Sequence, residues 1–339
     1  MRAITWGGRS LTSRRSLLAA PALLLARPAF AAFPDRAITL VTGFAPGGST
    51  DVAARLVADR MQTYLPAGTR IVVENRAGAG GTVASEWMKR QNPDGHMLML
   101  VEASSHAVAP NAIRGGTRYD PLADFTPVAI VGTGPLVLIT TPAFPARTPQ
   151  EVVAAMRGLG TDGITYASSG VGSIPHLAAE MFRLATGSTA PFLHVPYRSG
   201  GQMVEAIAKD EGSFGIAVLA SAAPQMRDGR VRGIALTSAR RSPAFPDLPT
   251  LGETALPGFD LGTWNVILAP KGAPPEVVAV LNEAITRAIA DPALKQRLLI
   301  AGVDAWEGPN SPADTGAFMA AELAKFREVV ARTGVQLDA

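Results

Sequence analysis

The stretch Gly43-Phe44-Ala45-Pro46-Gly47-Gly48-Ser49-Thr50-Asp51 decides the fold, because it joins an apolar, β-rich run at residues 38–42 to a helical pattern at residues 51–64. A strand, a short glycine-rich turn and a helix in this order open a βαβ unit. In an open α/β sheet, ligands bind beyond the carboxyl ends of the strands, where helix N-termini present unpaired N–H groups and partial positive charge. The stretch therefore predicts an α/β sheet and a candidate anion-binding loop.

Side chains at the end of this loop can also stabilise the helix that follows. Ser49, Thr50 or Asp51 can cap its N-terminus, and Asp51 can pair with Arg55 one turn on. The two adjacent glycines let the backbone approach a ligand closely. A capped turn that binds nothing is the alternative for this loop taken alone.

The alternation of strand and helix patterns continues along the chain in two series. The predicted strands lie at residues 71–74, 97–102, 136–140, 164–167, 192–195, 214–218, 264–269 and 303–306. The predicted helices lie at residues 81–91, 274–290 and 312–331, and three more begin at residues 149, 174 and 201. This order predicts two α/β lobes, each with a mostly parallel sheet covered by helices.

The N-terminus has the three parts of a secretory signal peptide. Arginines, among them Arg14 and Arg15, precede an apolar run at residues 17–26, and small residues follow up to Ala31. This run is too short to cross a membrane, which takes roughly twenty residues. We expect cleavage near Ala31 and export to the periplasm. Residues 13–18 resemble a twin-arginine export signal, and an ordinary secretory leader is the alternative.

Charge and cysteine content exclude several functional classes. Five of the 31 basic residues and none of the 28 acidic residues lie in the leader, so residues 32–339 carry a formal charge of about −2. No Lys/Arg cluster remains that would favour nucleic acid or an anionic membrane surface as a partner. The absence of cysteine excludes disulfides, thiolate metal sites and cysteine nucleophiles.

The chain after the leader is long enough for two lobes, because about 308 residues exceed what one hydrophobic core usually serves. We expect the chain to leave lobe one near residues 131–138 and to return near residues 259–268, so that two crossings form a hinge. The expected units are the signal peptide at 1–31, lobe one at 32–132 and 254–339, and lobe two at 133–253.

A second glycine-rich loop, residues 166–176, occupies the corresponding strand-to-helix position in lobe two. Two such loops facing each other across a cleft would offer paired helix N-termini to a carboxylate, each contributing about 0.3–1 kcal/mol. His176 lies one turn into the helix. We expect it to brace the loop by hydrogen bonding rather than to transfer protons.

Four motifs carry a specific resemblance: Phe44-Ala45-Pro46-Gly47-Gly48-Ser49-Thr50-Asp51, Val73-Glu74-Asn75-Arg76-Ala77-Gly78-Ala79-Gly80-Gly81, Asn92-Pro93-Asp94-Gly95 and Tyr119-Asp120-Pro121-Leu122-Ala123-Asp124-Phe125-Thr126-Pro127. They resemble the Bug family, the periplasmic solute receptors of tripartite tricarboxylate transporters. Further matches at residues 166–176, 195–197, 236–243 and 248–250 continue in family order over essentially the whole mature chain.

The resemblance implies a two-lobed α/β periplasmic-binding-protein fold (Venus flytrap, type II-like) with two hinge crossings, and a small carboxylate held mainly by backbone amides, hydroxyls and water. It implies no cofactor and no metal. The expected partners are the ligand and the membrane subunits of the transporter, and we expect a monomer. The ligand-binding residues it implies are Phe44, Gly47, Gly48, Ser49, Thr50, Asp51, Ser104, Ser105, Ser168, Ser169, Gly172, Ser173, His176 and Tyr197.

One departure from the family pattern bears on the ligand. Family members often have an acidic or amide residue where this chain has the apolar run Ala217-Val218-Leu219-Ala220 before Ser221. A ligand amino group would lose a partner there. The expected ligand is therefore a plain or aromatic carboxylic acid rather than an amino acid.

The two alternative functions are those of an α/β enzyme and of a receptor that serves a sensor kinase. An α/β enzyme lacks its sequence signals here, since there is no Gly-x-Ser-x-Gly elbow, no phosphate loop and no His-x-x-x-His pair. A receptor that presents its ligand to a sensor kinase would have the same lobes and stays open as an alternative to transport.

Overall fold

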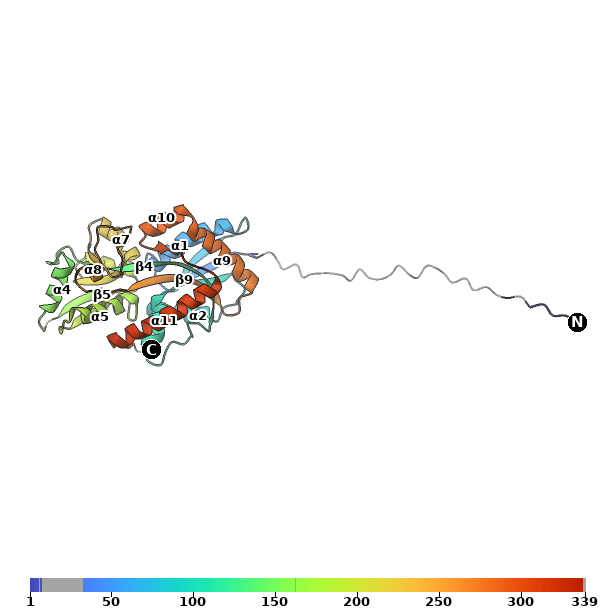
Figure 1. Cartoon of the computed structure of the whole chain (residues 1–339), viewed down its shortest axis with the longest axis horizontal. Helices are drawn as coiled ribbons and strands as arrows, with labels where there is room; N and C mark the ends of the chain where they lie inside the picture. The colour runs from blue at the N-terminus through green and yellow to red at the C-terminus, as the bar shows by residue number, and fades with distance from the viewer. Residues whose placement is uncertain (6, 8–32, 162, 338–339) are drawn as a thin grey trace.

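Two long strands run side by side through the middle of the molecule (Figure 1). In the computed structural model, which describes residues 1–5, 7, 33–161 and 163–337, β4 (Phe125–Thr140) pairs antiparallel with β9 (Gly262–Pro270). Their pairing extends from Phe125 opposite Pro270 to Pro135 opposite Gly262. The two strands join two blocks of sheet into one, in the order β2-β1-β3-β9-β4-β7-β5-β6.

Lobe one is the block that contains the first strands. Its strands β1 (Ile38–Thr42), β2 (Ile71–Asn75) and β3 (Met97–Glu102) are parallel, and β3 pairs antiparallel with β9. Its helices are α1 (Ser49–Met61), η1 (Gln62–Tyr64), η2 (Ala79–Gly81), α2 (Thr82–Met88), the π-helical turn η3 (Ser104–Val108), α3 (Ala109–Ala112), α9 (Pro275–Ala290) and α10 (Pro292–Ile300). The short strand β10 (Asp304–Ala305) pairs with β4.

Lobe two repeats this plan on the other half of β4. Its strands β5 (Ile164–Ser168), β6 (Phe192–Pro196) and β7 (Phe214–Val218) are parallel, and β7 and β8 (Arg232–Leu236) pair antiparallel with β4. Its helices are α4 (Pro149–Arg157), α5 (Ile174–Thr186), α6 (Gly200–Ala208), α7 (Leu219–Arg227) and α8 (Leu251–Thr254).

The last helix, α11 (Pro312–Thr333), packs on both lobes. It contacts η3, α3 and β4 of lobe one and α5 of lobe two. The indole Nε1 of Trp264, a buried residue of β9, donates to Glu322 Oε2 at 3.0 Å and fixes the helix to the crossing strands. Gly334 ends α11 in the left-handed conformation (φ 67°), which turns the chain back toward α3.

The predicted strands and helices agree with the structure to within a few residues, with two corrections. The sheet is mixed, not mostly parallel, because both crossing strands pair antiparallel. The strand predicted at residues 136–140 is the end of a 16-residue strand. Pro127, Gly132 and Pro135 interrupt its sequence pattern, and register shifts in the pairing with β9 lie beside Pro127 and Gly132.

Most of the predicted leader lies outside the described residues, so the cleavage near Ala31 and the export route stay predictions. The unit boundaries at 132/133 and 253/254 also stay predictions. Within the described part of the chain, no helix combines the length and apolarity needed to cross a bilayer.

Candidate functional site

The carboxyl ends of the parallel strands of both lobes meet at a single cavity of about 620 Å³. Lobe one contributes the loops after β1 and β2, and lobe two contributes the loops after β5 and β6. The lining residues are Gly43, Phe44, Ala45, Ala77, Gly78, Ala79, Gly80, Ala109, Ile113, Ser169, Gly170, Val171, Gly172, Tyr197, Arg198, Gln202 and Leu337.

Asp51 holds the loop after β1 in shape. Its Oδ2 accepts from the Gly47 N–H at 3.0 Å, and its Oδ1 accepts from Asn75 Nδ2 at 2.8 Å. The predicted pairing with Arg55 is confirmed at 2.8 Å. Burial acts to raise the pKa of Asp51, but hydrogen bonds from Arg55, Gly47 and Asn75 outweigh it and hold that pKa below its usual value. Asp51 is therefore ionised, and its hydrogen bonds make it a brace for this loop, that is, a side chain that holds the loop main chain in place.

The expectation that Ser49, Thr50 or Asp51 caps α1 is wrong. The N-cap residue is Gly48, and no side chain accepts a capping hydrogen bond there. The first N–H group of the helix, on Ser49, instead donates at 3.1 Å to Ser221 Oγ of lobe two. The hydroxyl of the opposite lobe thus satisfies this helix N-terminus.

The loop after β5 is braced from behind by histidine, as predicted. His176 Nδ1 accepts from the Gly172 N–H at 3.1 Å, and Ser173 caps α5 by accepting from the His176 N–H at 3.3 Å. Burial lowers the pKa of His176, so the ring stays neutral and its Nδ1 can accept. In this form the ring carries its single proton on Nε2 and acts on the loop as a hydrogen-bond acceptor.

Sequence reasoning missed His194 as part of this brace. Its Nε2 lies 2.6 Å from Ser168 Oγ, and its ring stacks on His176 at 4.2 Å between centroids. Burial, with a smaller contribution from His176, lowers the pKa of His194 to about 4. His194 lies on β6, and only the parallel pairing of β6 with β5 brings it beneath the loop.

A second hydrogen bond crosses between the lobes. The Ile174 N–H at the start of α5 donates at 2.9 Å to Ser104 Oγ, which in turn donates to Glu102 Oε1 at 2.5 Å. Thr50 Oγ1 lies 3.4 Å from Glu102 Oε2. All of these side chains are buried, and burial raises the pKa of Glu102 to about 7. Glu102 therefore lies inside the interface and does not line the cavity.

The structure places the predicted site residues in two groups. Phe44, Ser169, Gly172 and Tyr197 line the cavity. The others lie beside or behind its walls: Gly47, Gly48, Ser49, Thr50, Asp51, Ser104, Ser105, Ser168, Ser173 and His176. Of these, Ser105 is buried and its hydroxyl donates to the Glu102 carbonyl at 3.3 Å. Sequence reasoning missed Arg198, Gln202 and Leu337 as lining residues. Only the adjacency of Arg198 to Tyr197 could have indicated one of them.

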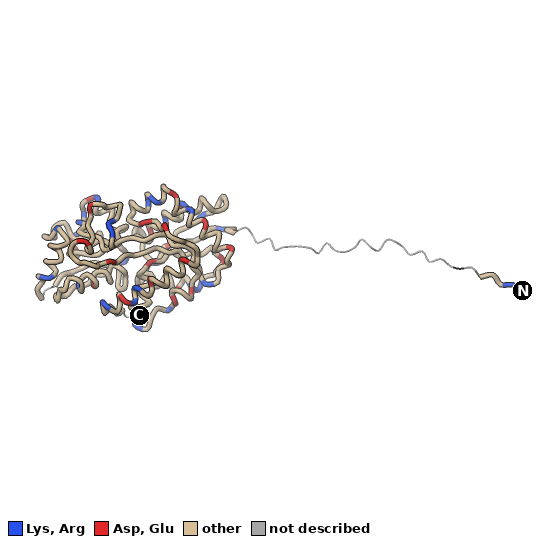
Figure 2. The backbone as a smooth tube through the Cα atoms, viewed as in Figure 1, with Lys and Arg blue, Asp and Glu red and all other residues tan. Residues whose placement is uncertain are grey.

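The residues that line the cavity carry positive charge and no negative charge. Arg198 is the single Lys or Arg side chain among the lining residues, is exposed, and no Asp or Glu lines the cavity. Over the described body as a whole, Lys/Arg and Asp/Glu are interspersed along both lobes (Figure 2). Among the described residues, no group of three or more His, Asp or Glu is placed to hold a metal ion.

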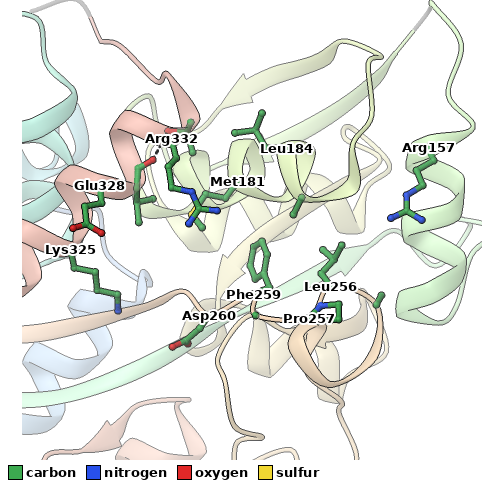
Figure 3. A pocket seen from close by; sticks show the side chains of 15 residues that line it. Arg157, Met181, Leu184, Leu256, Pro257, Phe259, Asp260, Lys325, Glu328 and Arg332 are labelled. Carbon is green, nitrogen blue, oxygen red and sulfur yellow. Dashed lines mark hydrogen bonds between the residues drawn. The ribbon is translucent and has the colours of Figure 1, made fainter.

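A second cavity of about 570 Å³ lies between α5, α11 and the loop before β9 (Figure 3). Its floor includes Met181 and Phe259, while charges of both signs line it. Lys325 pairs with Glu322 at 3.7 Å, and Arg157 Nε donates to the Thr186 carbonyl at 2.8 Å. These cations are already engaged within the protein, and no glycine-rich strand-end loop reaches this cavity.

Loss of the Ser221 hydroxyl should weaken lobe closure. Ser221→Ala leaves the buried Ser49 N–H unpaired in the closed form, which costs about 1–2 kcal/mol and lowers the ratio of closed to open molecules about 5- to 30-fold. Small-angle scattering should show a larger radius of gyration than for wild type. Ser238→Ala, which removes a hydroxyl bonded to Arg240 within lobe two, is the matched control. Identical profiles for all three proteins would contradict the role of Ser221.

Replacing Glu102 should change the pH dependence of stability. Because the pKa of Glu102 is raised from 4.5 to about 7 in the folded chain, the folded state retains a proton that the unfolded state releases. Stability should therefore fall as pH rises from about 4.5 to 7, by roughly 3 kcal/mol at most. Denaturant unfolding of Glu102→Gln should lack this fall. Glu283→Gln, at an exposed position of α9, should retain it.

Comparison with known proteins agrees with this geometry. The model of the TctC family, described as the tripartite tricarboxylate transporter family receptor, matches residues 53–335. The chain is 32% identical to Protein BugT of Bordetella pertussis (strain Tohama I) over 305 residues, which cover 90% of this chain and 91% of BugT.

Two solved structures contain ligands. Rpa4515 of R. palustris with adipate has a TM-score of 0.84 and 29% identity over 91% of this chain and 100% of that one. MatC from Rhodopseudomonas palustris with bound malate has a TM-score of 0.81 and 30% identity over 88% of this chain and 100% of that one. The structure of periplasmic binding protein BugD has a TM-score of 0.84 and 29% identity over 91% of this chain and 100% of that one, which confirms the two-lobed periplasmic-binding-protein fold. The chain belongs to the TctC family of solute-binding receptors of tripartite tricarboxylate transporters, the family to which the Bug proteins belong.

Proposed function

We propose that this chain is an exported receptor that captures a small carboxylate between its lobes and delivers it to the membrane subunits of a tripartite tricarboxylate transporter. The observation that carries the proposal is the charge of the interlobe cavity. Its lining contains Arg198 and no acid, so an anion is favoured over a cation or a neutral solute.

The main chain supplies the other donors. Ala45 on one loop and Val171 on the other both line the cavity, and neither N–H group has a hydrogen-bond partner among the described residues. Each lobe thus brings a residue with an unpaired N–H group to the cavity lining. A carboxylate, which has two oxygens that each accept hydrogen bonds, matches donors presented from two sides.

The remaining lining favours a ligand with an apolar body. Ala109, Ile113 and Leu337 contribute hydrocarbon to the walls. With no acidic side chain on the lining, an ammonium group would enter the cavity without a charged partner. These features support a plain or aromatic carboxylic acid over an amino acid. Adipate and malate, the ligands in the structures of Rpa4515 and MatC, are both dicarboxylates without an amino group.

The proposed cycle begins with an open receptor that binds the carboxylate on one lobe. Closure then brings the second loop onto the ligand and forms the Ser49–Ser221 and Ile174–Ser104 hydrogen bonds. Because these two bonds join opposite lobes, they exist only when the cleft is closed. A membrane partner can therefore recognise the loaded receptor by its closed shape, and no covalent chemistry is required of any residue.

Ligand binding should be visible as stabilisation. A carboxylate at 100 times its Kd should stabilise the mature protein by about 2.7 kcal/mol, because it binds the folded state alone. A thermal-shift screen of mono- and dicarboxylates, aromatic acids and amino acids should show the largest shifts for acids without an amino group. Arg198→Gln should reduce those shifts, and Arg240→Gln, an exposed position outside the cavity, should not. Equal shifts for amino acids, or turnover of the bound acid, would contradict the proposal.

A further inference from the structure

The chain after α11 is anchored on lobe one by its main chain. The Leu337 N–H donates to the Ala112 carbonyl and the Arg114 N–H donates to the Leu337 carbonyl, both at 2.9 Å. These two bonds form a parallel bridge between Leu337 and Ile113. Since both bonds use main-chain groups, the position of Leu337 does not depend on its side chain.

The Leu337 side chain points from this anchor into the space between the lobes. It is 6% exposed and lines the same cavity as Phe44 and Tyr197. It also meets the loop of lobe two, because a Cβ added at Gly172 would lie 2.4 Å from Leu337 Cδ1. Gly172 has φ +76°, so both its backbone conformation and the leucine above it require glycine.

From this geometry we propose that Leu337, on the segment that follows α11, is a specificity-determining wall of the ligand cavity. This inference rests on the proposed function. Together with Ala109 and Ile113, Leu337 forms a hydrocarbon surface against which the apolar body of the bound acid packs, while Ser169, Arg198 and Gln202 form the polar part of the lining. The size of the residue at 337 sets the length of ligand that fits.

The same contact links ligand size to closure. Leu337 is carried by lobe one and Gly172 by lobe two, and they touch when the cleft is closed. A ligand too long for the cavity has to displace Leu337 before the Gly172 loop can approach. Such a ligand would bind to one lobe while the cleft stays open. Leu337 therefore excludes it from the closed complex.

The test uses full-length mature protein and a series of linear dicarboxylates from succinate to suberate, with Kd measured by titration calorimetry. Leu337→Ala removes three carbons from the wall, so the best ligand of the wild type should bind at least tenfold more weakly. The preferred chain length should also increase by one or more carbons. Val335→Ala is the matched control, because Val335 lies on the same tail, is buried and does not line the cavity.

Each outcome has one meaning. A shift toward longer acids in Leu337→Ala that is absent in Val335→Ala supports the wall. An unchanged order of affinities in Leu337→Ala, or the same shift in both variants, overturns it and leaves the proposed function standing. The wild type should bind at least one dicarboxylate of the series. If it binds none of them, at 10 times the concentration at which another class of acid saturates it in the thermal-shift screen, linear dicarboxylates are not its ligands and the wall is overturned. Circular dichroism of both variants checks that the fold is retained.

Discussion

The antiparallel pairing of β4 with β9 is the constraint on which the rest of the structure depends. Strand β4 runs through both lobes: up to Pro135 it pairs with β9, and over residues 136–140 it pairs with β7 and β8. Lobe one therefore builds its parallel strands outward from β9, and lobe two builds its own outward from β4. The two blocks are thereby oriented with the carboxyl ends of their parallel strands toward each other. Every loop that lines the cavity follows from this orientation, because parallel strands present their following loops at one edge.

More than half of the residues that line the cavity are glycine or alanine, and several polar side chains near it hold the lining loops in place. Asp51 fixes the Gly47 N–H on one side, and His176 fixes the Gly172 N–H on the other. Asp51 is buried and His176 is half-buried, and each has a pKa that suits its role, ionised for the acid and neutral for the histidine. The N–H groups of these two glycines are thus held by neighbouring side chains.

Two hydroxyl groups reach across the interface between the lobes. Ser221 and Ser104 each accept from the first turn of a helix in the opposite lobe. A hydroxyl serves well here because it satisfies a helix N–H without bringing a full charge into a dry interface. The one carboxyl group inside this interface, Glu102, has a raised pKa for the same reason: burial penalises its charged form. Among the residues that line the cavity, Arg198 alone carries a charged side chain.

The sequence by itself determined the local elements and the family. Strand and helix patterns predicted most elements to within a few residues, because apolar periodicity and glycine-rich turns are local properties. The motifs around Phe44–Asp51 and Ser168–His176 correctly indicated the two loops that meet at the cavity. They did not distinguish residues that line it from residues that brace it, since a serine or aspartate can do either.

Only the tertiary structure decided which atoms meet across the lobes. Ser221, His194 and Leu337 lie 172, 26 and 165 positions from Ser49, Ser168 and Gly172, and nothing in their local sequence marks them as neighbours of those loops. Their roles come from strand order, from parallel register and from the turn after α11. These depend on how the two lobes pack on β4 and β9, and a pattern read along one segment carries no information about that packing.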